Sequence, residues 1–351
     1  MTTIASRLRE VAVQRHGNTS DKVLFAAMLA LSGLGLLMIY SATRSLGTFP
    51  MERQMVFVAA GLTLYLVASN IDYREYRHLA PWFSGLILVL LVVVFAFEPI
   101  NGAQRWIPLG FFNLQPAEFA KVAVILVMAS LLSPANRDEL GRKWLPWSKV
   151  GQALLVVAIP GALIFKEPDL GTALVFGFIL FAMLFAAGAT WRQMTTLTAG
   201  TAVAGLAMLR FELLEEYQLN RIKVLFDSTV EPQGIGYNLR QSKTAIGSGQ
   251  LLGKGLFEGT QTNFQYVPEQ ETDFIFTAVG EQLGFVGGII VVIAFTVIVW
   301  RLLVVSVNAR DRYGALIAVG IAAMVAFHVF VNVGMTIGVT PVTGLPLPLL
   351  S

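Results

Sequence analysis

Residues 316–339 read "LIAVGIAAMVAFHVFVNVGMTIGV", a stretch without a single Asp, Glu, Lys or Arg. At about 1.5 Å of rise per residue, a helix of this length crosses the roughly 30 Å hydrocarbon core of a bilayer. Similar runs recur along the 351 residues, of which 55% are hydrophobic and only 13% charged. A soluble domain carries about 25% charged residues. The sequence therefore predicts an all-α polytopic membrane protein.

The apolar runs predict nine spans, near residues 23–41, 54–70, 79–97, 116–133, 150–166, 170–188, 190–210, 274–300 and 313–338. Cytoplasmic flanks carry an excess of Lys and Arg, which orients the spans. With a cytoplasmic N-terminal segment, residues 1–22, the short outer loops hold four such residues and the inner segments fourteen. The outer four are Arg44, Arg53, Arg105 and Lys166. The inner fourteen are Arg7, Arg9, Arg15, Lys22, Arg74, Arg77, Arg137, Arg142, Lys143, Lys149, Arg192, Arg301, Arg310 and Arg312.

The stretch 211–272 then forms a large extracytoplasmic loop within a single membrane domain, residues 1–351. Loops longer than about 15 residues are usually functional or disordered. Because this one carries many apolar residues and glycines, we expect short amphipathic helices and turns on the outer membrane surface.

Composition excludes several kinds of site. The chain has no cysteine, which rules out a disulfide, a thiolate zinc site and a thiol nucleophile. The three histidines are isolated, and we interpret His328, in an apolar run, as a packed or hydrogen-bonded residue rather than a metal ligand. The net charge of +3 is explained by the basic cytoplasmic segments, so no nucleic-acid partner is expected.

Charged groups beside membrane spans are candidates for function, and three clusters lie at the predicted outer face. In "QPAEFAKV" (115–122), Glu118 and Lys121 are three residues apart on one helix face, where they can neutralise each other. This pair is either structural or a rigid wall of a site. In "KEPDLGT" (166–172), Asp169 is typical of a helix N-cap, although Lys166 and Glu167 would face the same outer cavity.

The third cluster, "YVPEQETDFIF" (266–276), contains Glu269, Glu271 and Asp273. Asp273 stands at the mouth of the eighth span, where a helix N-cap and a functional carboxylate are equally consistent with the spacing. Glu269 and Glu271 are typical of solvated loop acids. Several cations share this face and would suit the phosphate of an anionic amphiphile, while a carboxylate could accept a proton from a nucleophile.

Four segments together resemble the SEDS proteins (shape, elongation, division and sporulation), the family that contains RodA, FtsW and SpoVE. They are "NGAQRWIPLGFFNLQPAEFAKVA" (101–123), "EPDLGTAL" (167–174), the stretch 236–287 and "FVNVGMTIGVTPVTGLPLPLLS" (330–351). They follow the family order over essentially the whole chain, and the wording "RQSKTAIGSG" with Lys243 is closer to the RodA branch.

The resemblance implies a bundle of ten membrane helices and a peptidoglycan glycosyltransferase that polymerises lipid II into glycan strands during cell elongation. It places the proposed catalytic aspartate at Asp273, the family's Glu-x-x-Lys pair at Glu118 and Lys121, and its Asp-Leu-Gly-Thr motif at Asp169. It further implies a bacterial cytoplasmic membrane protein and, as partner, a class B penicillin-binding protein. The family continues past "PLPLLS" into a tenth span, so we expect that this chain lacks that helix.

The reaction suggests roles for the remaining charges. A sugar 4-hydroxyl must attack C1 of another sugar with inversion and expel undecaprenyl pyrophosphate, which requires one general base, Asp273. The pyrophosphate needs cations, and the candidates are Arg44, Arg53, Arg105, Arg210, Arg221 and Lys243, with Arg105 and Arg221 favoured. Glu269 and Asp169 would line the same cavity. A divalent cation, Mg²⁺ or Mn²⁺, could help to balance the charge of the pyrophosphate, although no cluster of ligands in the sequence requires one.

A transporter that flips lipid II across the membrane is the main alternative, since many spans, charges in the bundle and an anionic lipid substrate fit it equally well. Transporters more often show two halves with matching interrupted spans, and the sequence contains no such repeat. The unusual charges also gather on one side of the membrane. A third alternative is a scaffold that only docks the penicillin-binding protein.

Overall fold

The computed structural model describes residues 21–351 except 45–46, 48, 100–102, 111, 134–143, 213–214 and 228, with the backbone alone for Phe49. Most of the predicted segment 1–22 and the basic residues Arg137, Arg142 and Lys143 therefore lie outside the described residues. Helices occupy all nine predicted span ranges. They are α2 (Lys22–Thr43), α3 (Phe49–Asn70), α4 (Glu75–Val93), α5 (Pro116–Leu132), α7 (Trp147–Lys166), α8 (Leu170–Ala186), α9 (Trp191–Arg210), α13 (Ile275–Val307) and α14 (Arg312–Ile337), and α4 continues as the 3-10 helix η1 (Val94–Ala96).

Within the described part of the chain, six helices are long and apolar enough to cross a membrane: α2, α3, α4, α7, α13 and α14. The all-α membrane fold is confirmed, and the number of spans stays a prediction. Side chains at the borders of the apolar runs fix where helices begin. Asp21 accepts from the first amides of α2 (3.1 Å), Asp311 from the Gly314 amide in α14 (2.9 Å), and Thr190 forms a capping box at the start of α9.

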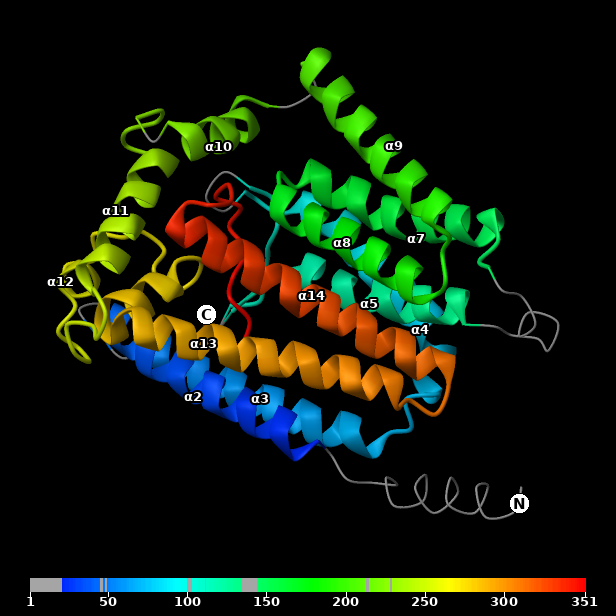
Figure 1. Ribbon diagram of the computed structural model, residues 1–351, viewed down its shortest axis with the longest axis horizontal. Helices are drawn as coiled ribbons and strands as arrows, with labels where there is room; N and C mark the ends of the chain where they lie inside the picture. The colour runs from blue at the N-terminus through cyan, green and yellow to red at the C-terminus, as the bar shows by residue number, and fades with distance from the viewer. Residues whose placement is uncertain are drawn as a thin grey trace.

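Helix α14 lies at the centre of the bundle (Figure 1). On one side it packs against α5 and α8, whose apolar core also includes residues of α4 and α7, and on the other against α13, which in turn packs on α2. The C-terminal segment, residues 339–351, runs back between these two halves. Leu345 is buried in the first apolar core, and Leu347 and Leu350 are buried in the second. This segment thereby brings backbone carbonyls into the interior of the bundle.

Two side-chain contacts show that α2 and α13 run antiparallel. Arg301 forms an ion pair with Asp21 at 2.7 Å, and Ser41 donates to Gln282 at 3.0 Å. The bundle thus has two distinct ends. We call the end with Ser41, Gln282 and the start of α13 the site end, and the end with Asp21, Arg301 and the start of α14 the basic end.

Helix α13 is interrupted at Gly284, whose φ of 66° lies in the left-handed region. Segment 250–255 fills the break. The two amides that follow Gly284 donate to carbonyls of this segment at 2.8 and 3.1 Å, and two amides of the segment donate to carbonyls of the helix at 3.0 and 3.1 Å. The backbone groups released by the interruption are therefore satisfied, as membrane-level backbone requires.

The chain between α9 and α13 contains the expected short helices α10 (Glu216–Phe226), α11 (Ile235–Ser248) and α12 (Thr260–Asn263). Helix α11 packs on the start of α13 and the end of α14. Gly249 permits this approach, because a Cβ there would overlap the Gly280 carbonyl. The extracytoplasmic location of the 211–272 stretch stays a prediction.

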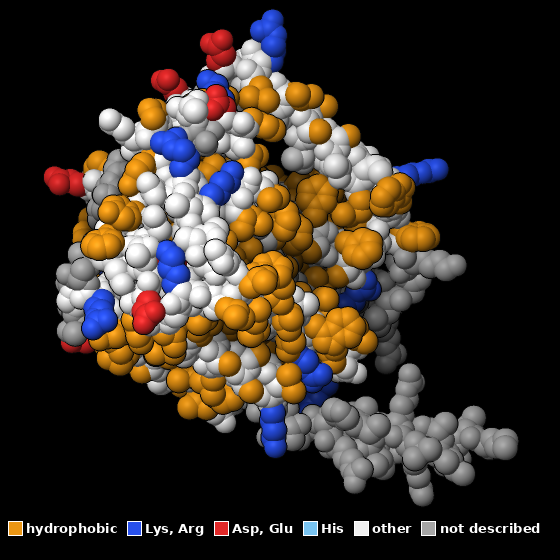
Figure 2. Space-filling model, turned by 60° about the vertical axis from the view of Figure 1, so that its left-hand side comes forward, with side chains coloured by type: hydrophobic (Ala, Val, Ile, Leu, Met, Phe, Trp, Pro, Cys, Tyr) orange, Lys and Arg blue, Asp and Glu red, His pale blue; other side chains and the backbone are white. Residues whose placement is uncertain are grey.

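Hydrophobic side chains cover much of the outer surface (Figure 2). The apolar window of α3 is 0% buried, and α9 buries only Gln193 among its side chains. In a soluble protein such faces would be costly to expose, whereas hydrocarbon tails are as apolar as these side chains. The exposed apolar faces are the lipid-facing surface of the protein.

Candidate active site

Asp273 lies in the turn that precedes α13. Its amide donates to the Glu269 carbonyl (3.1 Å), and its own carbonyl accepts from Asn332 Nδ2 (2.8 Å). The same Asn332 nitrogen donates to the Leu345 carbonyl at 2.7 Å and so joins the turn to the C-terminal segment. The N-cap of α13 is Phe274, and no side chain caps this helix. The interpretation of Asp273 as a helix cap is therefore wrong.

The C-terminal segment covers the Asp273 carboxylate. Gly344 has φ 75°, and a Cβ at this position would lie 3.2 Å from Asp273 Oδ2. Glycine both adopts the left-handed backbone at no steric cost and leaves room for the carboxylate. Across the described ranges, no donor hydrogen-bonds to this carboxylate, so its lone pairs are available to a bound molecule.

Arg105 reaches the site from the segment before the small hairpin formed by β1 (Ile107–Pro108) and β2 (Asn113–Leu114). Its Nε donates to the Glu167 carbonyl at 2.9 Å and its Nη2 to the Pro168 carbonyl. These carbonyl oxygens fix the guanidinium in place, and no carboxylate of the described residues forms an ion pair with it.

Arg221 approaches from α10. It donates Nη1 to the Thr343 carbonyl at 2.9 Å, beside Gly344, and lies over the Tyr217 ring at 5.7 Å. Its Nε is buried without a hydrogen-bond partner among the described groups. Burial and the charge of Arg105 lower the pKa of Arg221. An anion bound near the two arginines would accept a hydrogen bond from the unpartnered Arg221 Nε and would offset the repulsion between the two positive charges.

Asp169 caps α8, as predicted. Its Oδ1 accepts from the Thr172 amide (3.0 Å), and its Oδ2 accepts from the Thr172 hydroxyl (2.9 Å) and from Gln115 Nε2 (3.2 Å). A Cβ at Gly171 would collide with the Leu345 side chain. The capping motif therefore packs directly on the C-terminal segment and holds a fixed negative charge near Asp273.

These charges set the protonation of Asp273. Burial raises its pKa to about 6, and the Glu269 carboxylate adds to the increase. Arg221 and Arg105 lower the pKa in part, and Asp169 raises it further. The carboxylate is consequently ionised at neutral pH, yet is a stronger base than an exposed aspartate, a combination typical of catalytic carboxylates.

Glu167 is fully buried, and neither of its carboxylate oxygens has a hydrogen-bond partner in the described part of the protein. Burial, followed by the charge of Asp169, raises its pKa to about 8, against a smaller lowering by Arg105. Glu167 is therefore protonated at neutral pH, and the site carries less negative charge than its sequence suggests.

Glu118 and Lys121 form the ion pair suggested by their spacing, with Lys121 Nζ 2.7 Å from Glu118 Oε1. Lys121 is only 2% exposed, and Nζ also lies 2.9 Å from His328 Nε2. The other ring nitrogen, His328 Nδ1, donates to the Pro346 carbonyl at 3.2 Å. His328 is thus a hydrogen-bonded residue, as expected, and the chain of contacts ends on the same C-terminal segment that covers Asp273.

The structure brings together Asp273, Glu269, Asp169, Arg105 and Arg221, whose charges act most strongly on the Asp273 carboxylate. It places the other predicted cations differently. Arg44 is exposed at the end of α2, Arg53 is half-buried in α3, and Arg210 is exposed at the end of α9. The exposed Lys243 lies against Gly338. These four form no ion pair with the site carboxylates, so their contact with pyrophosphate stays a prediction.

The described residues contain no group of three or more His, Asp or Glu that could hold a metal ion. Two of the nearby carboxylates are also committed elsewhere, since Asp169 caps a helix and Glu167 is protonated. A divalent cation at this site stays a prediction, and none of the steps below passes through a metal.

Sequence reasoning missed three residues that hold the site together: Asn332, Thr343 and Gly344. A signal existed for Asn332, which is an amide within an apolar span and is buried at 0% exposure. Thr343 and Gly344 contribute through backbone geometry, which local spacing does not reveal.

Comparison with known proteins identifies the family. The family model for FtsW, RodA and SpoVE, described as a cell cycle protein, matches residues 21–351. The chain belongs to this family. It is 38% identical over 333 residues to the peptidoglycan glycosyltransferase MrdB of Escherichia coli K12, covering 94% of this chain and 88% of the relative. It is likewise 38% identical over 343 residues to a probable peptidoglycan glycosyltransferase FtsW of Trichlorobacter lovleyi, covering 94% and 87%.

Solved structures of family members share the fold. A chain from a structure on the coordination of polymerization and crosslinking by a peptidoglycan synthase complex aligns with TM-score 0.77 and 29% identity, covering 93% of this chain and 90% of the other. The crystal structure of the rod shape determining protein RodA of Thermus thermophilus aligns with TM-score 0.68 and 27% identity, covering 95% and 91%. The predicted resemblance is therefore confirmed.

Proposed function

We propose that this FtsW/RodA/SpoVE family protein is a peptidoglycan glycosyltransferase that polymerises lipid II with Asp273 as its general base. One observation carries the assignment of the base. The Asp273 carboxylate caps no helix, accepts no hydrogen bond from the described residues, and feels the charges of two arginines that are anchored by backbone carbonyls. The backbone of Asp273 is fixed, but its carboxylate makes no capping or hydrogen-bonding contact, so it is free to accept a proton from a substrate.

In the proposed reaction, the 4-hydroxyl of the acceptor sugar donates its proton to Asp273 as its oxygen forms a bond to C1 of the donor sugar. The bond from C1 to the pyrophosphate oxygen breaks on the opposite face, which inverts the configuration at C1. A base with a pKa of about 6 is ionised at neutral pH and close to the operating pH, where general-base catalysis is most effective.

Arg105 and Arg221 would receive the departing pyrophosphate. Pyrophosphate leaves as an anion, so it requires electrostatic stabilisation rather than a proton. A cavity of about 420 Å³ lies beside them, lined by Phe95, Phe165, Lys166, Pro168, Glu215, Tyr217 and Gln218. The Lys121 ion pair would hold the C-terminal segment, and with it the cover over Asp273, in position.

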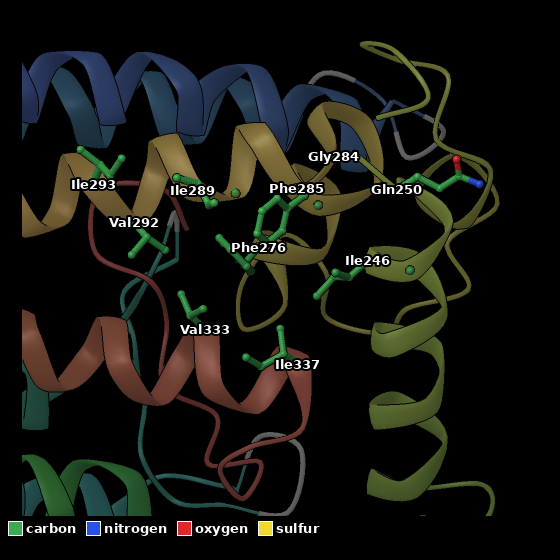
Figure 3. A pocket seen from close by; sticks show the side chains of 13 residues that line it. Ile246, Gln250, Phe276, Gly284, Phe285, Ile289, Val292, Ile293, Val333 and Ile337 are labelled. Carbon is green, nitrogen blue, oxygen red and sulfur yellow. The ribbon is translucent and has the colours of Figure 1, made fainter. Parts of the chain in front are cut away.

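An apolar groove of about 390 Å³ at the site end would accept part of the prenyl chain (Figure 3). Phe276, Ile289 and Val292 of α13 face Val333 and Ile337 of α14 across this groove, and α11 closes one side. Because the groove contains almost no polar group, it suits a hydrocarbon chain. It begins next to Phe276, three residues after Asp273.

The names of the related proteins help to choose between a polymerase and a lipid II transporter. Those quoted above are named as glycosyltransferases, which favours the polymerase over a lipid II transporter. The structure on a peptidoglycan synthase complex supports a penicillin-binding protein as the partner of this chain. We further propose that the protein resides in the bacterial cytoplasmic membrane with Asp273 on the extracytoplasmic side, and that it serves cell elongation.

The test is polymerisation of lipid II by the purified full chain, with and without the penicillin-binding protein, in the wild type and in Asp273→Asn. Asparagine preserves volume but accepts no proton, so the variant should fold and form no glycan strands. Glu271→Gln, a neutral substitution in the same turn, should retain activity. The wild-type rate should fall as the pH drops through about 6, because a protonated Asp273 is no base.

Full activity of Asp273→Asn would remove the residue from the mechanism. Movement of lipid II across a vesicle membrane by the wild type, without any glycan strand, would instead identify a transporter.

A further inference from the structure

The basic end of the bundle contains a cavity of about 560 Å³ that the reaction does not use. Four arginines and a single acid line it. Its lining residues are Arg74, Arg77, His78, Ser133, Arg310, Asp311, Arg312 and Tyr313. Asp273 contacts α14 at Asn332, 19 residues after Tyr313 of this cavity, so about 29 Å of helix separates the two sites. We call this cavity the arginine cavity.

The one acid does not neutralise the arginines. Asp311 caps α14 through the Gly314 amide (2.9 Å), accepts the Tyr73 hydroxyl (3.0 Å) and forms an ion pair with Arg74 (3.1 Å). Arg77, Arg310 and Arg312 form no ion pair with any described residue, and Arg312 only donates to the Ala187 carbonyl (2.6 Å). Among the described residues, the arginine cavity therefore holds a surplus of positive charge.

Tyr313 supplies a second, independent observation. Its side chain is 3% exposed, and its hydroxyl has no hydrogen-bond partner among the described residues. The ring is fixed by stacking on Tyr73 (6.5 Å) and by the Arg77 guanidinium above it (5.7 Å). Buried hydroxyls are normally hydrogen-bonded. The Tyr313 hydroxyl belongs to a residue that lines a cavity rich in cations, where the oxygen of a bound anion would accept a hydrogen bond from it.

An apolar groove of about 710 Å³ follows the arginine cavity along the same three helices. From α14, Ile317 and Ile321 lie four and eight residues after Tyr313, and therefore on the same helix face. From α4, Leu79, Phe83 and Leu86 line the groove just beyond Arg77, and α5 contributes on the third side. The molecule thus presents cations and an unsatisfied donor at the level of a helix end, and a long apolar surface next to them.

We propose that the arginine cavity and this groove together bind an anionic phospholipid, with its phosphate among the arginines and an acyl chain along the groove. Basic pockets between helix ends are suited to lipid headgroups. Soluble phosphate offers the same headgroup chemistry, but it would leave the apolar groove unexplained. The site is separate from the Asp273 site and independent of the proposed reaction.

The experiment is native mass spectrometry of the full chain in detergent, titrated with phosphatidylglycerol or with phosphatidylcholine of the same acyl chains. The wild type should retain phosphatidylglycerol about tenfold better, as charge-assisted hydrogen bonds predict. Arg77→Gln with Arg310→Gln should abolish this preference. Tyr313→Phe keeps the ring and loses only the hydroxyl, so the preference should decrease while the unfolding temperature of the delipidated protein stays unchanged.

Arg192→Gln, which removes an exposed arginine of α9 at the same end, is the matched control and should behave as the wild type. Equal retention of phosphatidylglycerol by the wild type and by both cavity variants would overturn the proposal. So would stabilisation by millimolar inorganic phosphate that equals the effect of the lipid, since that result would assign the cavity to a soluble anion. If the double arginine variant does not fold, Tyr313→Phe carries the test.

Discussion

Replacing Gly344 by alanine tests the cover over Asp273, because the substitution adds a single methyl group next to the carboxylate. Alanine at φ 75° costs about 1–2 kcal/mol from backbone strain alone. The new Cβ would also lie 3.2 Å from Asp273 Oδ2, which is tighter than ordinary contact. The carboxylate must then shift by a few tenths of an ångström.

A misplacement of about 1 Å can lower a rate by about 100-fold, so the smaller shift predicts a loss of roughly 3- to 10-fold for Gly344→Ala. The assay is the initial rate of lipid II polymerisation, together with the unfolding temperature of the same preparation. Gly110→Ala is the matched control, because Gly110 has φ 83° and nothing within 4 Å of its would-be Cβ. It should reproduce the strain and lose no activity beyond what reduced stability explains.

Equal losses of activity in the two variants would show that backbone strain, and not contact with Asp273, is responsible. Full activity of Gly344→Ala would show that residue 344 does not cover the carboxylate in the working enzyme. Either result would refute the geometry described for the C-terminal segment.

Three further predictions concern the buried polar groups and the close approach of α11. Burial raises the pKa of Glu167 from 4.5 to about 8, so its contribution to stability is complete below about pH 4.5 and is lost as the pH rises to about 8. The wild-type unfolding temperature should therefore fall between about pH 5 and 8 more than that of Glu167→Gln. Glu118→Ala leaves the buried Lys121 without its counter-ion and should lower the unfolding temperature more than Lys121→Met, which leaves only the 42%-exposed Glu118; the opposite order would contradict this assignment of burial. Gly249→Ala should destabilise the protein and expose α11 to proteolysis because its Cβ overlaps a carbonyl of α13, whereas Gly247→Ala has open space and should be neutral or stabilising by about 0.5–1 kcal/mol; equal protease sensitivity of the two would argue against the contact.

The long helices could be predicted from the sequence because a segment that crosses hydrocarbon must be a long, apolar and almost uncharged run. Apolar runs are local signals, and most helices begin and end within a few residues of the expected positions. The exceptions are α3, which begins five residues early, and α13, which ends seven residues late. The capping role of Asp169 is equally local, because the cap and the amide it binds are three residues apart.

The candidate site could be predicted only in part. Arg105 and Arg221 were identified by charge and expected side of the membrane, but spacing did not separate them from Arg44 or Arg210. The distinction depends on contacts between positions far apart in the chain, such as Arg221 with the Thr343 carbonyl. The same holds for the role of Asp273, since spacing allowed a helix cap and only the position of the Phe274 N-cap excluded it.

The interruption of α13 at Gly284 also acts as a ruler. Residues 275–283 form about 13 Å of helix between the break and the turn that holds Asp273. Segment 250–255 is hydrogen-bonded to α13 on both sides of the break. The distance from this bonded junction to the proposed base is therefore fixed by backbone geometry, so the long apolar part of α13 and the Asp273 turn belong to one rigid unit.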